Sequence, residues 1–286
     1  MREFVIITDA GSDLPVSVAN KLGVVVVSLE VNMEDNLKLS DQIDIKEFYE
    51  YLRAKHGAKT SALNIDRLTE VFEPYLAEGK DVLYIAFSSG LSATYMAGRN
   101  AAEDLAEKYT DAKVVVVDSL CASLGQGLIV KHAVDKKNSG ASIDEVAAYV
   151  EEIKPKLAHW FTVEDLFFLK RGGRVSAATA VVGTMLQIKP ILHVDDEGKL
   201  VSMDKARGRQ GSLKALFDKM KESAIEPEKQ TVYISHGDCY DDAKRLADMI
   251  SAELGVTDIL ISEIGPVIGA HSGPGTIALF YLGSKR

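Results

Sequence analysis

Four short apolar segments, separated by helical patterns, constrain the fold of the first half of the chain more than any other feature. They are rich in valine and isoleucine and span residues 4–7, 24–29, 82–87 and 114–117. Between them, apolar residues recur at helical spacing, for example over residues 45–55 and 64–76. Strands that alternate with helices predict a parallel sheet with helices on both faces. Ligands of such sheets bind beside the carboxyl ends of the strands.

The second half of the chain follows a different pattern. After Pro155, apolar segments at residues 190–194 and 199–203 flank the turn sequence Asp195-Asp196-Glu197-Gly198, which predicts an antiparallel hairpin. Further strands are predicted at residues 231–235, 258–262 and 276–282, with helices at about 211–222 and 240–254. We therefore expect an α/β protein of two domains. These are a mainly parallel α/β domain over residues 1–155 and an α+β domain with a mixed or antiparallel sheet over 156–286.

Composition narrows the classes of function. Apolar residues make up 47% of the 286-residue chain and charged residues 26%, which is typical of a soluble globular protein. The 33 basic and 42 acidic residues give a net charge of −9, which argues against a general nucleic-acid binder. The two cysteines, Cys121 and Cys239, indicate neither a disulfide framework nor a metal site. A strand begins near residue 4 and no apolar run could span a bilayer, so we expect a cytoplasmic protein without a transmembrane segment.

A loop rich in hydroxyl groups follows the third predicted strand. Ser88, Ser89, Ser92 and Thr94 lie within seven residues at a strand-to-helix turn. Hydroxyl groups beside the first turn of a helix can donate hydrogen bonds to an anion. Ordinary capping of the helix needs only one of the four hydroxyls. The cluster therefore favours a site for an anionic group.

A segment rich in glycine and proline lies near the end of the chain. Residues 264–276 contain four glycines, two prolines and a single histidine, His271, between two predicted strands. Glycine permits positive φ and close backbone approach, whereas proline fixes φ. The pattern predicts a tight turn that directs His271 and backbone N–H groups towards a small polar or anionic group. The alternative is a stiff hairpin in which His271 only fills a gap. Of the other histidines, His56, His132 and His159 are predicted to be structural, and His193 and His236, at strand ends, are second-rank candidates.

Two clusters of basic residues, at 170–174 and 205–209, stand out in this acidic chain. Such a cluster is usually a solvated face of the protein. Arginines separated by glycines also suit the recognition of a phosphate or an acidic partner, because guanidinium groups form bidentate contacts.

The sequence also contains a faint esterase pattern. Ser92, Asp118 and His271 follow one another in the order of an α/β-hydrolase triad, and Gly90-Leu91-Ser92-Ala93-Thr94 is similar to a nucleophile elbow. However, Ala93 stands where the last glycine of the elbow belongs, and Ser92 lies beyond the tip of the predicted strand. A serine esterase or thioesterase that uses Ser92 remains an alternative function.

Seven segments, in this order along the chain, resemble the DegV family, which includes the fatty-acid-binding subunits of bacterial fatty acid kinase. They are Ile7-Thr8-Asp9 with Ser12-Asp13-Leu14-Pro15; Thr60-Ser61; Ser88-Ser89-Gly90-Leu91-Ser92-Ala93-Thr94-Tyr95; Asp118-Ser119 with Gly125-Gln126-Gly127-Leu128; Leu169-Lys170-Arg171-Gly172-Gly173-Arg174; residues 205–209; and residues 265–275. The resemblance covers nearly the whole chain.

The resemblance implies a lipid-binding protein that is not itself an enzyme. It implies two α/β domains with one long-chain fatty acid between them as ligand, and no cofactor. The positions that match the family's carboxylate-binding residues are Thr60 with Ser61, Ser92 with Ser89 nearby, and His271. The glycines of the supporting loop match Gly269, Gly273 and Gly275. A separate ATP-binding kinase subunit would phosphorylate the bound acid, and Arg174, Arg207 and Arg209 would face that partner or the new phosphate. A carrier of another small carboxylate is a further alternative.

Overall fold

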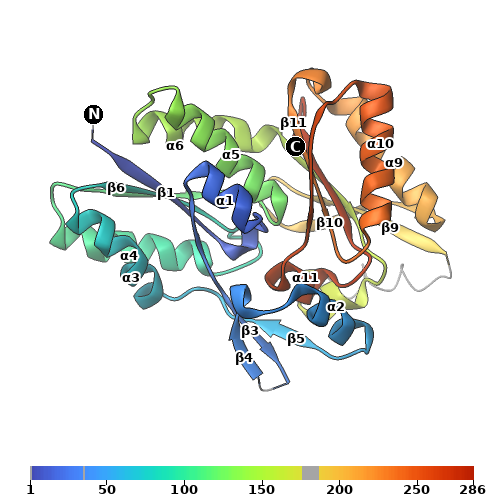
Figure 1. The fold of residues 1–286 in the computed structure, drawn as a ribbon, viewed down its shortest axis with the longest axis horizontal. Helices are drawn as coiled ribbons and strands as arrows, with labels where there is room; N and C mark the ends of the chain where they lie inside the picture. Colours follow the sequence, from blue (N-terminus) through green and yellow to red (C-terminus); the bar gives the residue numbers. More distant parts are fainter. Residues whose placement is uncertain (1, 35, 176–186) are drawn as a thin grey trace.

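The first part of the chain forms a four-stranded parallel sheet in the computed structural model, which describes residues 2–34, 36–175 and 187–286. The strand order is β2 (Val25–Val27), β1 (Phe4–Asp9), β6 (Asp81–Ala86), β7 (Val114–Asp118). Helices cover both faces of this sheet (Figure 1). The predicted parallel α/β architecture is confirmed.

Alternate residues of the central strand β6 supply the two layers of the core. Leu83 packs with residues of α1 (Val16–Leu22), α5 (Leu124–Asn138) and α6 (Ile143–Ile153). Tyr84 packs on the opposite face with residues of α3 (Ile65–Ala77) and α4 (Thr94–Lys108). All six residues of β6 are buried, as expected for a central strand that is covered on both faces.

The second part of the chain forms a six-stranded mixed sheet. Its order is β10 (Leu200–Arg207), β9 (Ile188–Val194), β8 (Leu157–Thr162), β13 (Ile277–Leu282), β11 (Thr231–His236), β12 (Asp258–Glu263). Neighbouring strands are antiparallel except β11 and β12. One face packs against α9 (Gly208–Ser223) and α10 (Tyr240–Leu254). The other face shares a core with α5 of the first part. The mixed sheet and the β9–β10 hairpin agree with the sequence-based prediction.

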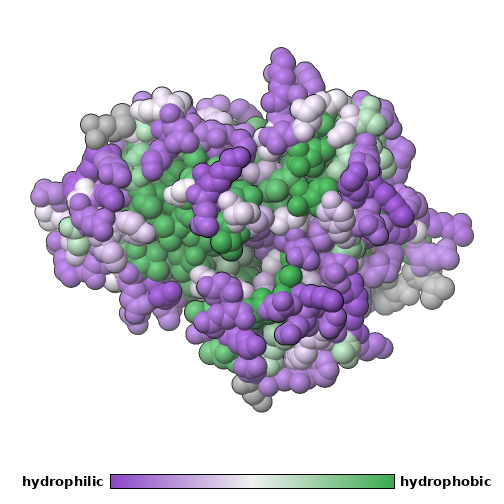
Figure 2. All heavy atoms as spheres, viewed as in Figure 1, coloured by the Kyte–Doolittle hydropathy of each residue, from purple (hydrophilic) through white to green (hydrophobic). Residues whose placement is uncertain are grey.

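The predicted division of the chain at residue 155 falls within η3 (Lys154–Lys156), a 3₁₀ turn that connects α6 to β8. Hydrophilic residues cover most of the face in Figure 2, and apolar residues are grouped towards its centre. Within the described residues, no helix is long and apolar enough to cross a membrane.

A third, three-stranded antiparallel sheet was not predicted. It consists of β4 (Asn36–Leu39), β3 (Glu30–Met33) and β5 (Ala58–Thr60), with α2 (Ile45–Arg53) between β4 and β5. This small sheet lies at the bottom of Figure 1, beside α2 and α11. Thr60 is the last residue of β5 and pairs with Val31. Strand pairing in the small sheet therefore fixes the position of Thr60.

The glycine- and proline-rich segment contains a helix, so the prediction of a simple tight turn was wrong. This helix, α11, spans Pro266–Ser272. Pro266 occupies the first helical position, and Gly273, with φ 78°, ends the helix. Gly269 lies inside α11 instead of in a loop. A Cβ atom there would lie 2.9 Å from both Phe48 Cε1 and Tyr49 Oη, so glycine allows α2 to approach α11 closely.

Candidate functional site

A cavity of about 300 Å³ lies between the two large sheets. Most of its wall is apolar, and its apolar body is formed chiefly by strands and loops of both parts of the chain: Leu29, Phe87, Phe161, Val194, Leu200, Ala278 and Phe280. Val267 and Ile268 of α11 also face it. A mostly apolar cavity of this kind suits a ligand that is largely hydrocarbon.

One side of the cavity is polar. Thr60 Oγ1 lies 2.8 Å from His271 Nε2, a hydrogen bond between residues that are 211 positions apart. Thr60 is the end of β5 and His271 is in the last turn of α11. Ser61 and Ser92 line the same cavity. We call Thr60, Ser61, Ser92, Arg174 and His271 the polar end.

The imidazole of the polar end is neutral. Burial, together with the nearby charges of Arg174 and Arg171, lowers the pKa of His271 to about 4. At neutral pH the ring therefore offers one N–H donor and one acceptor nitrogen. The hydroxyl of Thr60 can either donate to Nε2 or accept from it. Thr60, Ser92 and His271 thus present hydrogen-bonding groups that carry no charge of their own.

Ser92 is positioned by the start of α4. Its Oγ accepts a hydrogen bond from the Thr94 N–H at 3.2 Å and lies 2.9 Å from Thr94 Oγ1. Thr94 Oγ1 in turn accepts from the Leu63 N–H at 3.2 Å, which links this loop to the segment after Thr60. The two hydroxyl-bearing loops are therefore joined beside the polar end.

The other hydroxyls of the cluster do not reach the cavity. Ser88 Oγ donates to Gly198 O at 2.8 Å and so ties the loop to the β9–β10 turn. Ser89 is exposed, and its backbone N–H donates to Asp118 Oδ1 at 3.1 Å. Ser89 is not part of the cavity wall. Of the four residues in the cluster, only Ser92 lines the cavity.

The predicted esterase triad is not assembled. Ser92 Oγ bonds to Thr94, whereas the Nε2 atom of His271 bonds to Thr60. Asp118 Oδ1 accepts from the backbone N–H groups of Ser89 and Leu120. Nucleophile, base and acid are therefore engaged by other partners, and no relay connects them.

Arg174 connects the cavity to a surface groove. Its Nε and Nη2 atoms donate to Leu91 O at 3.2 and 3.0 Å, and Nη1 donates to Gly172 O. The groove has a volume of about 450 Å³ and includes Lys59 and Arg171. Thr60, Arg174 and His271 line both the cavity and the groove. The polar end is therefore also the part of the cavity wall that adjoins this groove.

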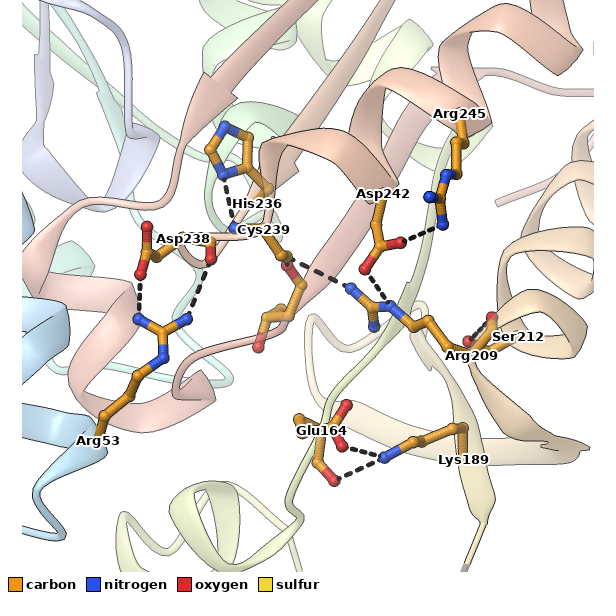
Figure 3. Close-up of polar contacts among 11 residues, drawn as sticks. Arg53, Glu164, Lys189, Arg209, Ser212, His236, Asp238, Cys239, Asp242 and Arg245 are labelled. Atoms are coloured by element: carbon orange, nitrogen blue, oxygen red, sulfur yellow. Dashed lines mark hydrogen bonds and ion pairs between the residues drawn. The ribbon is translucent and has the colours of Figure 1, made fainter.

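The second basic cluster lies elsewhere. Figure 3 shows Arg209 directed towards α10, where its Nε pairs with Asp242 Oδ2 at 2.8 Å and its Nη2 lies 3.3 Å from Cys239 Sγ. Arg207 is exposed at the end of β10. Neither arginine lines the cavity or the groove. The structure thus separates Arg174 from the two other arginines that were predicted to act with it.

Several residues of the site were not identified from the sequence. His159 lines the cavity from β8, where its Nδ1 lies 2.9 Å from Leu157 O. Phe161, Ala278 and Phe280 line it from β8 and β13. An apolar side chain that faces a cavity has the same strand pattern as one that faces solid core, so the sequence carries no signal that separates the two.

Comparisons with known proteins identify the family and the fold. A family model described as an uncharacterised protein of the DegV family matches residues 3–284. A DegV domain-containing protein of Clostridium perfringens is 47% identical over 290 residues, which cover 100% of this chain and 99% of the relative. The structure of a fatty-acid-binding DegV family protein from Thermus thermophilus is 30% identical, with a TM-score of 0.87 and coverage of 99% and 100%.

A more distant structure shares the fold. The fatty acid kinase B3 protein of Streptococcus pneumoniae, solved with linoleic acid bound, is 22% identical with a TM-score of 0.86. The alignment covers 98% of this chain and 99% of that protein.

Proposed function

This chain belongs to the DegV family, and we propose that it binds one long-chain free fatty acid in the cavity between its two large sheets. The acyl tail would lie in the apolar body. The carboxylate would accept hydrogen bonds from Ser92 and from one member of the Thr60–His271 pair, because the other member donates within the pair, and Ser61 would lie beside them. Residues 1–155 and 156–286 would form two domains, and each would contribute part of the cavity. The observation that carries it is the gathering of Thr60, Ser61, Ser92, Arg174 and His271 at one part of a cavity whose wall is mostly apolar.

The physical chemistry of the cavity supports this ligand. Burial of an alkyl chain contributes about 0.8 kcal/mol per methylene group. A carboxylate that leaves water needs donors, and hydrogen bonds to a charged acceptor are the stronger kind. Neutral hydroxyl and imidazole donors supply them without burying additional charges. Arg174, which lines the same cavity, adds a favourable positive charge nearby.

We include in the proposal that the bound carboxylate is presented to a separate ATP-binding fatty acid kinase subunit. The support is that Thr60, Arg174 and His271 belong both to the cavity and to the surface groove. A phosphoryl donor could therefore approach the carboxylate through the groove while the tail stays buried. Since ATP is supplied in the cytoplasm, the proposal places the protein there.

Lipid analysis of the purified protein tests the binding proposal. We expect denaturation to release about one equivalent of a long-chain fatty acid, detected by mass spectrometry, and added palmitate to raise the melting temperature of delipidated protein. A protein that yields no acyl chain and shows no shift with palmitate contradicts the proposal. Recovery of a carboxylate that is not a lipid would instead indicate a carrier of another small acid.

A coupled assay tests presentation to a kinase. The palmitate-loaded protein is mixed with ATP and the ATP-binding subunit of a bacterial fatty acid kinase, and acyl phosphate is trapped with hydroxylamine. We expect Arg174→Gln to reduce acyl phosphate formation and Arg209→Gln, its matched control, to leave the rate unchanged. Equal rates for both variants contradict a role of Arg174 at the groove.

A fluorophosphonate probe that labels Ser92 would point to the esterase alternative.

A further inference from the structure

Helix α11, which carries His271, is attached at both ends to the first part of the chain. At its C-terminal end, His271 Nε2 contacts Thr60 Oγ1 at 2.8 Å. At its N-terminal end, the N–H of Gly265, the residue that caps the helix, donates to Asp13 Oδ1 at 2.9 Å. Gly265 and Asp13 are 252 positions apart. Together with the hydrogen bond from Tyr49 Oη to Ile264 O at 2.8 Å, these contacts hold a helix of seven residues against the first part of the chain.

Asp13 is the centre of a buried polar network at this junction. Its Oδ2 accepts from Ser123 Oγ at 2.6 Å, and Ser123 Oγ lies 2.9 Å from Ser235 Oγ. Asp13 follows β1, Ser123 precedes α5, and Ser235 belongs to β11 of the six-stranded sheet. Asp13, Ser123 and Ser235 are all buried. One carboxyl group thus connects both large sheets with the start of α11.

The backbone at this junction is strained. Asp13 has φ 50° and Ser123 has φ 54° and ψ −150°, conformations that non-glycine residues rarely adopt. Strained residues persist where surrounding contacts hold them, and they concentrate at functional sites. Gly265 is also constrained, because a Cβ atom there would lie 2.9 Å from Asp13 Oδ1. The contact between Asp13 and α11 therefore depends on a close approach that an alanine would obstruct.

We propose that Asp13 is a positioning residue for the fatty-acid carboxylate, because it holds the start of α11 and thereby places His271 at the polar end. The inference rests on the proposed function. Since α11 has only two turns, a displacement of its first residue is transmitted to His271 in its last turn. The same helix carries Val267 and Ile268 into the cavity wall. The position of Asp13 therefore governs both His271 and part of the apolar body.

The network keeps its hydrogen bonds in either protonation state of Asp13. Burial raises the pKa of Asp13 to about 8. The charged form accepts from Ser123, whereas the protonated form can donate to Ser123, which then donates to Ser235. The titratable side chains near it are Tyr49 of α2 and, in a second groove that Asp13 also lines, Asp41 and Glu263. Asparagine retains an acceptor for Gly265 and a donor for Ser123, so it should substitute for the acid.

Three variants test this role: Asp13→Ala, Asp13→Asn and the control Asp41→Asn. The control removes an exposed carboxyl group from the second groove, which Asp13 also lines. The readouts are palmitate affinity and the ¹⁵N ring shifts of His271, assigned by comparison with His271→Gln. We expect Asp13→Ala to weaken palmitate binding about tenfold and to move the His271 shifts, since a buried partner is lost. Asp13→Asn and Asp41→Asn should stay within about twofold of wild type, with unchanged His271 shifts.

If Asp13→Ala does not fold, Gly265→Ala is used, because its added Cβ obstructs the same contact from outside the cavity wall, and the His271 shifts should again move. Wild-type protein that binds palmitate, together with folded Asp13→Ala or Gly265→Ala protein whose affinity and His271 shifts are unchanged, overturns the positioning role and leaves the proposed function intact. Failure of Asp13→Asn to restore both readouts also overturns it. Wild-type protein that does not bind palmitate contradicts the proposed function itself.

Discussion

The polar end and the apolar body of the cavity are built from different kinds of structure. The polar end contains residues from chain segments that lie far apart in the sequence: Thr60 is the last residue of a strand, Ser92 precedes a helix, and His271 is in the last turn of another helix. The apolar body relies on side chains from the faces of regular strands, such as Phe161 and Ala278. The comparison suggests a division of roles, in which the body provides most of the affinity and the polar end fixes orientation.

The largest predicted effect concerns the apolar body. Shortening the ligand from sixteen to twelve carbons should weaken binding by about 3 kcal/mol, or roughly two hundredfold, because four methylene groups are no longer buried. Calorimetric titration of delipidated protein with a series of saturated acids measures this slope. The slope should be the same in a Thr60→Val variant, which alters only the polar end. A flat series would show that the body does not bind the tail.

A smaller loss is expected at the polar end. Thr60→Val keeps the shape of the side chain but removes the hydroxyl that contacts His271. We expect palmitate affinity to fall by about 2 kcal/mol, or some thirtyfold, because a buried donor to the carboxylate is lost. Hexadecanol, which lacks the carboxylate, serves as the control ligand and should lose much less. Equal losses for acid and alcohol would contradict a carboxylate contact.

A matched pair of serines separates the residues of the hydroxyl loop. Ser92→Ala should weaken palmitate binding by about 1 kcal/mol, or roughly fivefold, because Ser92 lines the cavity. Ser89→Ala should have no measurable effect, since Ser89 is exposed and outside the cavity wall. Calorimetry on both variants provides the comparison. A loss for Ser89→Ala as large as that for Ser92→Ala would contradict the assigned orientation of the loop.

The smallest expected effect is a change in acid sensitivity. The pKa of His271 is lowered to about 4 in the folded protein, whereas an unfolded histidine titrates near its ordinary value. The unfolded state therefore binds more protons between these values, so the stability contributed above pH 6.5 is lost as pH falls towards 4. Relative to wild type, His271→Gln should lose less unfolding free energy between pH 7 and 6, by about 0.7 kcal/mol. Urea denaturation at the two pH values measures this difference, and equal losses would contradict a buried neutral His271.

The sequence predicted the large elements of the fold because their signals are local and strong. The valine-rich segments became β1, β2, β6 and β7, and the predicted hairpin became β9 and β10. The small sheet was missed, although Glu30–Met33 and Asn36–Leu39 are four-residue strands of a hairpin. Strands this short carry too few residues for a clear alternation. Their pairing is decided by packing against α2 and α11.

The site was predictable where chemistry marks a residue, and not where only three-dimensional arrangement does. Thr60, Ser92 and His271 were identified and lie at one cavity. Helix α11 was mistaken for a turn because four glycines outweighed the start and stop signals of Pro266 and Gly273. The contact of Asp13 with Gly265 joins residues 252 positions apart, and no local sequence pattern predicts it. The prediction that Thr60 and His271 belong to one site came from the family resemblance and not from their spacing in the sequence.

The central claim is that one fatty acid binds with its carboxylate at the polar end. A crystal structure of the protein grown with palmitate tests it most directly. The account predicts carboxylate oxygens within hydrogen-bonding distance of Thr60 Oγ1, Ser92 Oγ or His271, and a tail that runs along Phe161 and Ala278. A palmitate whose carboxylate lies away from these three residues, or a cavity that stays without ligand at saturating palmitate, would contradict it.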